Sequence, residues 1–149
     1  MSQLNDFMRY ANVISKSYQV PRQKLDLAVS DFLEQIAALE PKIASMPFFS
    51  IQELPNDWVF IKLYISLQNP MSNLPKGLHF DSYFFIDNMA SCAIHGNDLQ
   101  NQTAEGHDKL QAFLSEKSLV PTTPVFTEIH GDEDFTFTIL KVGYTEAFE

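Results

Sequence analysis

The chain has 149 residues and a mass of 17.0 kDa, which is the usual size of one domain with a proper core. Its 45% apolar and 13% aromatic content favours a folded globule over a disordered segment. The formal net charge of −9 argues against binding to nucleic acid or to anionic membranes, since both need a basic surface, and it suits cationic ligands or basic protein partners.

The cysteine content and the N-terminal residues bear on the cellular compartment in which the protein is expected. Cys92 is the only cysteine, so an internal disulfide is excluded. The first residues lack the basic start and apolar run of a signal peptide, and no apolar stretch approaches the roughly 20 residues that span a bilayer. We therefore expect a soluble, cytoplasmic protein with no membrane and no nucleic-acid partner.

The first half of the chain begins with a predicted strand and helix. Residues 10–20 are rich in β formers, and Pro21 closes that strand because it cannot donate to a ladder. Residues 1–8 either lead into this strand or lie loosely on the surface. An apolar residue at every third or fourth position then predicts a helix over about residues 22–40. These positions are Leu25, Val29, Phe32, Ile36 and Leu39.

A β-hairpin is predicted next, with residues 48–53 and 58–67 joined by a turn at 54–57. Its second strand alternates two kinds of side chain. The aliphatic set is expected to face the helix and comprises Val59, Ile61, Leu63, Ile65 and Leu67. The other set contains an aromatic row that faces a groove or a partner, unless a loop or the N-terminus covers it. This row is Trp58, Phe60 and Tyr64.

The second half repeats this order after a connector at residues 68–79. A strand over 80–94, a helix over 103–118 and a hairpin of residues 124–130 and 135–144 are predicted. Local signals mark the ends of these elements: a bend at Asp87–Asn88, a strand end at residues 96–98, an N-cap at Thr103, a polar turn at residues 131–134 and a frayed tail over residues 145–149.

The two halves are offset copies of one unit. The same sequence offset separates Phe49 from Phe126 and Trp58 from Phe135. The prediction is an α+β fold in which two β-α-β-β repeats form an antiparallel sheet with both helices on one face. We expect a single domain over residues 1–149, with halves at about 9–69 and 80–144.

Glu128 is the residue most suited to chemistry, because it lies in an otherwise apolar strand. Phe126, Glu128 and His130 share one strand face, and the other face is expected to pack on the helix. A carboxylate among aromatic rings can bind a cation or act as a general base. The alternative is a solvated glutamate on an exposed sheet face. His130 either hydrogen-bonds Glu128 or only closes the hairpin.

Catalytic and metal-binding patterns are missing from the sequence. The four histidines lack metal-ligand spacing, and no phosphate-binding loop, dinucleotide fingerprint or hydrolase elbow is present. Cys92 is interpreted as a small core residue. No nucleophile, base and orienting group can be assembled. We therefore expect a protein that is not an enzyme and holds no cofactor and no metal.

The order of elements, with His95–Gly96 ending a strand and Glu128 centred in a later one, resembles the GyrI-like effector-binding superfamily. The resemblance implies a groove between the halves that binds small, often cationic, ligands. It also implies that Glu128 is the recognition residue. His130 stands where a tyrosine is common in that superfamily.

A closer resemblance is to small proteins of unknown function encoded beside LXG polymorphic toxins of type VII secretion systems in Gram-positive bacteria. The matching stretches are residues 47–50, 78–84, 87–89, 123–126 and 131–133. This resemblance implies an accessory or immunity-like role beside a secreted toxin.

Two functions follow as expectations. The first is a non-catalytic adaptor that binds an LXG toxin or its small helical partner proteins. The second is a small-molecule sensor or sequestering protein for a cationic or aromatic ligand. In the second, Glu128 is the cation anchor with Phe126 and His130 beside it, and the aromatic row of Trp58, Phe60 and Tyr64 forms stacking walls.

Overall fold

The computed structural model describes residues 2–94, 99–131 and 136–147. The chain forms two compact units, and each is described by itself. The first unit is Arg9–Phe84, and the second unit combines Met1–Met8 with Phe85–Glu149. Two long strands, β1 (Ser2–Pro21) and β4 (His79–Ile94), contribute residues to both units.

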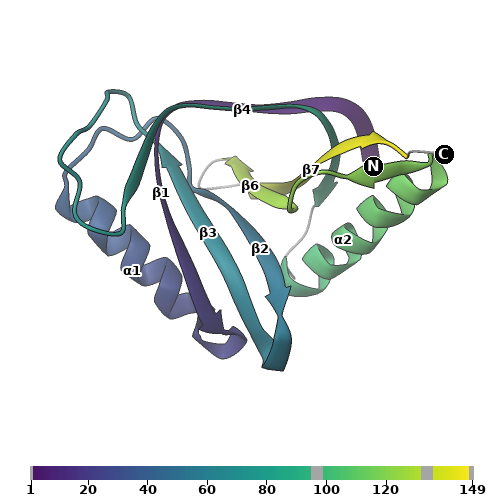
Figure 1. Ribbon diagram of the computed structural model, residues 1–149, viewed down its shortest axis with the longest axis horizontal. Coiled ribbons are helices and arrows are strands. Elements are labelled where there is room, and N and C mark those ends of the chain that lie inside the picture. Colours follow the sequence, from purple (N-terminus) through teal and green to yellow (C-terminus); the bar gives the residue numbers. More distant parts are fainter. Residues whose placement is uncertain (1, 95–98, 132–135, 148–149) are drawn as a thin grey trace. The chain divides into compact units, whose positions relative to one another are not determined.

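The first unit is a helix packed on an antiparallel sheet. After β1 the chain passes through a 3-10 turn, η1 (Arg22–Lys24), into helix α1 (Leu25–Ala38). The predicted hairpin is present as β2 (Phe48–Leu54), η2 (Pro55–Asp57) and β3 (Trp58–Ser66). Strand β3 is central and pairs antiparallel with both β1 and β2. Figure 1 shows α1 running along these strands.

The core of the first unit has the predicted composition. Phe32 and Ile36 of α1 are buried against Ile61, Leu63 and Ile65 of β3. The whole aliphatic set of β3 is buried, so the predicted inner face is confirmed. Period-two alternation on the strand and a three-to-four spacing on the helix bring two apolar surfaces together, and burying them drives the packing.

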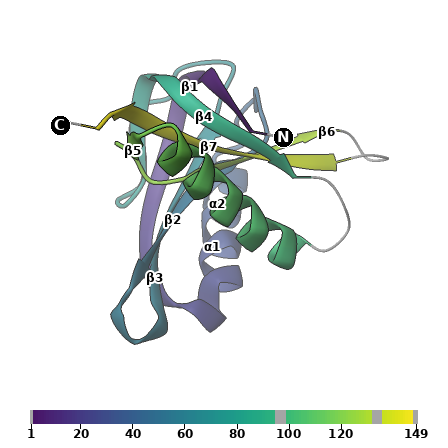
Figure 2. The same cartoon turned by 90° about the vertical axis from the view of Figure 1, so that its right-hand side faces the viewer.

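The second unit is also a helix packed on an antiparallel sheet, and its central strand is β7 (Thr136–Glu146). Its other elements are α2 (Leu99–Glu116), β5 (Leu119–Pro121) and β6 (Phe126–Gly131). Strand β7 pairs antiparallel with β4, β5 and β6. Figure 2 shows α2 lying along this sheet. Leu110 and Leu114 of α2 pack on Cys92, Leu140 and other apolar residues, so Cys92 is a core residue as predicted.

A glycine allows α2 to approach the sheet closely. Gly106 is buried in the helix, and a Cβ atom added there would lie 2.9 Å from both Ile94 Cδ1 and Leu140 Cδ1. Any larger side chain would push the helix away from β4 and β7. The glycine therefore sets the helix-to-sheet distance in this unit.

Several predicted boundaries are wrong. Helix α2 begins at Leu99, so Thr103 lies inside it and is not its N-cap. The first turn of α2 is polar after Leu99 and carries no apolar stripe, which is why the periodicity missed it. The prediction also missed β5, because three residues are too few to show alternation. Residues 2–8 were expected either to lead into the first strand or to lie loosely on the surface, and in the structure they are part of β1. Strand β7 reaches Glu146, into the tail that was expected to fray.

Other predictions hold or lie outside the described residues. Asn88 has a left-handed φ of 52° within β4, at the predicted bend. The strand end at residues 96–98 and most of the turn at 131–134 fall outside the described residues. The α+β class with antiparallel strands and two helices is confirmed. The prediction of a single domain over residues 1–149 stays a prediction.

In the part of the chain that the structure describes, no helix is both long enough and apolar enough to cross a membrane. The cytoplasmic location stays a prediction.

Candidate functional site

Glu128 is buried, and its charge is paired. Only 3% of the residue is exposed, so the alternative of a solvated glutamate is wrong. Its Oε1 atom lies 2.7 Å from Nζ of Lys141, and the Lys141 side chain is itself only 10% exposed. Lys141 lies on the adjacent strand β7, where its register partner is Phe126. Two neighbouring strands therefore point opposite charges to the same side of the sheet.

A second carboxylate shares the same ammonium. Lys141 Nζ lies 3.5 Å from Asp6 Oδ1 and donates a hydrogen bond of 2.8 Å to the Phe7 carbonyl oxygen. Burial acts to raise the pKa of Asp6, but the Phe7 amide, the Ser91 hydroxyl and the Lys141 ammonium together hold that pKa below its usual value. We call Glu128, Asp6 and Lys141 the Glu128 cluster. In this cluster two carboxylates lie around the Lys141 ammonium.

His130 lies at the rim of the Glu128 cluster. Its Nε2 atom is 3.3 Å from Glu128 Oε1, so the predicted contact is present. The imidazole ring stacks on Phe137 with centroids 5.4 Å apart and an angle of 18°. Phe126, two residues before Glu128, is buried on the same strand face. Carboxylate, imidazole and phenyl groups are thus gathered on β6 and β7, although their role in ligand binding stays a prediction.

The three residues of the aromatic row on β3 differ in their exposure to solvent. Tyr64 is buried, whereas 43% of Trp58 is exposed at the beginning of the strand and Phe60 is partly buried. The row is therefore covered at its Tyr64 end and open at its Trp58 end, because burial increases along β3. The three residues belong to the first unit, and Phe126, Glu128 and His130 belong to the second.

Tyr64 takes part in a four-ring cluster that the sequence analysis missed. Its ring stacks on Phe48 with centroids 4.7 Å apart and an angle of 4°. Tyr10 stacks on the same Phe48 ring at 4.4 Å, and Phe84 meets both Phe48 and Tyr64 edge-on at 5.3 Å. We call these four residues the aromatic cluster. The predicted hairpin turn could have revealed the Phe48–Tyr64 pair, because its register places them opposite each other.

The environment of Tyr64 raises the pKa of its phenol to about 12. Burial is the largest cause, and the negative charge of Asp81 acts in the same direction. A hydrogen bond with Ser50 acts in the opposite direction and offsets part of the rise. Folding therefore keeps this phenol neutral at a pH where an unfolded tyrosine is ionised.

Substitution of Tyr64 by phenylalanine is expected to flatten the alkaline stability curve. Since the pKa is about 12 in the fold and about 10 in the unfolded chain, Tyr64 costs stability as the pH rises from 10 towards 12. Urea denaturation of wild type and Tyr64→Phe between pH 9 and pH 11.5 measures this. The control is Tyr83→Phe, at a side chain that is 56% exposed, which should follow wild type. Equal slopes in all three proteins would contradict the prediction.

No group of three or more His, Cys, Asp or Glu side chains is placed to hold a metal ion within the described residues. The Glu128 cluster, with its lysine at the centre, is a charge-pairing arrangement and not a ligand set for a cation such as zinc.

Several solved structures share the fold of this chain. The EcmrR C-terminal domain has 9% identity and a TM-score of 0.68, over 99% of this chain and 98% of that chain. EcmrR in a complex with DNA has 11% identity and a TM-score of 0.66, over 98% of this chain and 58% of that chain. SAV2435 bound to tetraphenylphosphonium has 8% identity and a TM-score of 0.53, over 97% and 93%. At these identities the likeness shows the fold alone.

The chain belongs to the family described as a domain of unknown function, DUF5085, whose model matches residues 9–146. No curated protein matches the chain. A hydrolase from Listeria innocua shares the fold with 8% identity and a TM-score of 0.58, over 97% of this chain and 91% of that chain. The expectation that this chain is not an enzyme stays a prediction. None of these matches bears on LXG toxins or type VII secretion, so that part of the sequence resemblance stays a prediction.

Proposed function

We propose that this chain is a small-molecule-binding domain that takes up a lipophilic organic cation at the Glu128 cluster. The observation that carries the proposal is the buried carboxylate of Glu128, which shares a single ammonium, Lys141, with a second carboxylate, Asp6. The expected adaptor role beside an LXG toxin has no comparable support from the structure.

The charge balance of the Glu128 cluster favours a cation. Removing a carboxylate from water is costly unless a positive charge compensates it. The Lys141 ammonium lies within 4 Å of both carboxylates, and two carboxylates gathered in one place favour a positively charged ligand. An organic cation with apolar substituents suits this place better than a metal ion, because its own desolvation cost is small.

Aromatic groups beside the Glu128 cluster suit the apolar part of such a ligand. Phe126 shares the strand face of Glu128, and Phe137 carries the stacked ring of His130. A cation above an aromatic face gains about 0.5–2 kcal/mol. SAV2435, which shares the fold, has been solved with tetraphenylphosphonium, a cation of this class. The predicted stacking residues Trp58, Phe60 and Tyr64 lie in the first unit.

Tetraphenylphosphonium is the probe for the proposal. We expect it to raise the melting temperature of wild type and to bind with a Kd in the micromolar range by calorimetry. Glu128→Gln and Asp6→Asn each remove one negative charge from the Glu128 cluster at nearly constant volume. Each is expected to weaken binding by about tenfold or more, as the loss of one charge interaction of ~1.4 kcal/mol or more implies.

The matched control is Glu116→Gln, which removes one negative charge from an exposed position in the same unit. It should bind the probe as wild type does. Circular dichroism checks that each variant is folded before binding is measured. Absence of any thermal shift in wild type, or equal affinity in all four proteins, would overturn the proposal.

A further inference from the structure

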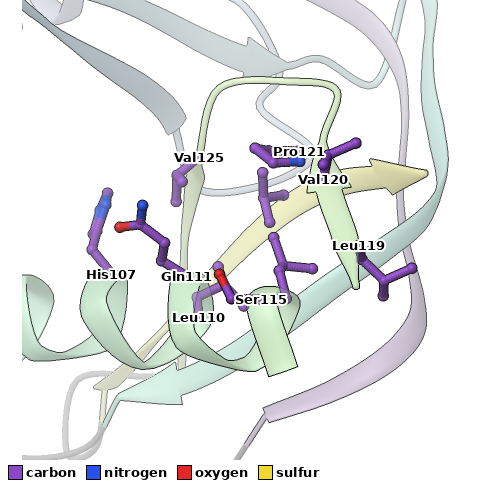
Figure 3. Close-up of a pocket in the computed structure, with 10 residues that line it drawn as sticks. His107, Leu110, Gln111, Ser115, Leu119, Val120, Pro121 and Val125 are labelled. Carbon is purple, nitrogen blue, oxygen red and sulfur yellow. The ribbon is translucent and has the colours of Figure 1, made fainter. Parts of the chain in front are cut away.

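A pocket of about 280 Å³ lies between helix α2 and the segment that follows it. Leu110 lies on the helix side of the pocket, and Val120, Pro121 and Val125 form the opposite wall (Figure 3). Leu114, also on α2, lines the pocket as well. All of these residues belong to the second unit. The pocket is concave, and its apolar walls face each other.

The turn after α2 creates this pocket. Ser118 has a left-handed φ of 56° and closes the helix by donating its amide to the Ser115 carbonyl at 3.1 Å. The chain then returns as β5, antiparallel to β7. The Thr122 amide donates to the Gly143 carbonyl at 2.8 Å, and the Gly143 amide donates to Thr123 Oγ1 at 2.8 Å. These bonds hold the outer wall in place.

The polar groups of the pocket lie in one row on α2. His107, Gln111 and Ser115 follow each other at intervals of four residues, which places them on one helix face at the rim. Within the described part of the chain, the side chains of Gln111 and Ser115 have no hydrogen-bond partner. Their donors and acceptors are therefore available to a ligand.

The described lining carries no fixed charge. No Asp, Glu, Lys or Arg side chain lines the pocket among the residues that the structure describes, although the chain as a whole carries a net charge of −9. A charged ligand would lose its hydration here without meeting a counter-ion, which is unfavourable. A neutral molecule with an apolar body loses little and gains contact with both walls.

The pocket is separate from the Glu128 cluster. Val142 lines the pocket, whereas its neighbour Lys141 belongs to the Glu128 cluster, and successive residues of a strand point to opposite faces. Its volume also lies below the usual range of roughly 300–1,000 Å³ for drug-sized ligands. Tetraphenylphosphonium, with four phenyl groups, is too large for it.

We infer that this pocket is a second binding site, which takes a small neutral aromatic molecule that carries one hydrogen-bond donor. The aromatic ring lies between the leucine wall of α2 and the wall formed by Val120, Pro121 and Val125. The donor is directed to the Gln111 carboxamide oxygen at the rim. The ligand class thus differs in size and charge from that proposed for the Glu128 cluster.

Indole is the probe, and methyl-resolved NMR is the measurement. Indole is expected to shift the methyl signals of Leu114, Val120 and Val142 and to leave those of Ile61 in the first unit unchanged. 1-Methylindole, which lacks the donor, should bind about five- to tenfold more weakly, as expected for the loss of one neutral hydrogen bond. Protonated tryptamine should bind more weakly still, because the pocket offers its charge no partner.

Gln111→Leu tests the role of the rim. It is expected to lower the affinity for indole to that for 1-methylindole and to leave 1-methylindole unchanged, a pattern that general loss of structure would not produce. Gln23→Leu, at an exposed position of the first unit, is the matched control and should behave as wild type. Val120→Trp fills the pocket from its exposed wall and should abolish the indole shifts.

The inference is overturned if indole causes no methyl shifts, if shifts spread over both units, or if Gln111→Leu weakens both probes equally. Tetraphenylphosphonium binding to Gln111→Leu distinguishes the two sites. The affinity of Gln111→Leu for tetraphenylphosphonium should equal that of wild type. A failed indole experiment therefore does not decide whether the cation binds at the Glu128 cluster.

Discussion

Lys141→Met is expected to lower the free energy of unfolding by about 3–5 kcal/mol at pH 7, which is the usual cost of removing one partner from a buried ion pair. The Lys141 ammonium lies within 4 Å of both Glu128 and Asp6. Without it, two carboxylates on the same side of one sheet repel each other in a place that water reaches poorly. The Phe7 carbonyl oxygen would also lose its donor.

The pH dependence of the loss of stability distinguishes repulsion between the two carboxylates from a simple packing defect. Lys141 helps to hold the pKa of Asp6 below its usual value, so without the ammonium the burial of Asp6 acts to raise that pKa. Protonation at low pH then relieves the repulsion, so the deficit relative to wild type should shrink as the pH falls from 7 towards 4. A packing defect would give a deficit that does not depend on pH.

Urea denaturation of wild type, Lys141→Met and the double variant Glu128→Leu/Lys141→Met measures the effect. The double variant replaces the pair by apolar groups and is expected to recover most of the loss, as replaced buried pairs generally do. Lys24→Met, at an exposed position, is the control and should cost less than about 0.5 kcal/mol. A deficit below 1 kcal/mol in Lys141→Met would contradict the buried position of the pair.

Phe48→Ala is expected to lower the free energy of unfolding by about 3–5 kcal/mol, as for other buried phenylalanines that leave a cavity. Phe48 is 1% exposed, stacks between Tyr10 and Tyr64, and meets Phe84 edge-on. Each well-placed aromatic pair adds about 0.5–1.5 kcal/mol beyond the buried area. Phe48 and Phe84 each contact all three other rings of the aromatic cluster, but only Phe48 does so with two stacked pairs.

Chemical denaturation and near-ultraviolet circular dichroism measure this effect together. Phe48→Leu, which keeps apolar volume but loses the rings' stacking, should lie between wild type and Phe48→Ala. Trp58→Ala is the matched control, since it removes a larger ring from the exposed end of β3 and should cost about 1 kcal/mol or less. Equal losses in Phe48→Ala and Trp58→Ala would show that the aromatic cluster contributes no more than an exposed ring.

Local patterns in the sequence were sufficient for most of the fold. The four-three spacing from Leu25 to Leu39 predicts α1, and the alternation from Trp58 to Ser66 assigns the correct residues to the core. These patterns are strong because they report which side chains leave water, and that is decided within a few residues of chain. They fail for β5, which at three residues is too short to show alternation, and for the first turn of α2, which is polar after Leu99.

The candidate site could be predicted only in part. Glu128, Phe126 and His130 share a strand face, and the contact between His130 and Glu128 follows from their spacing alone. Lys141 could not be found in this way, because an isolated lysine in an apolar strand also fits an exposed face. Asp6 could not be predicted either, because the N-terminal residues belong to the same compact unit as residues 85–149, which are far away in the sequence.

The sequence by itself determined the α+β class and the inner faces of α1 and β3, and it directed attention to Glu128 as a candidate site residue. Only the tertiary structure decided that Glu128 is buried and shares Lys141 with Asp6, that Tyr64 belongs to an aromatic cluster, and that a neutral pocket lies beside α2. The reason is physical. Periodicity depends on neighbours along the chain, whereas charge compensation, ring stacking and cavities depend on residues that only the folded chain brings within a few ångströms of each other.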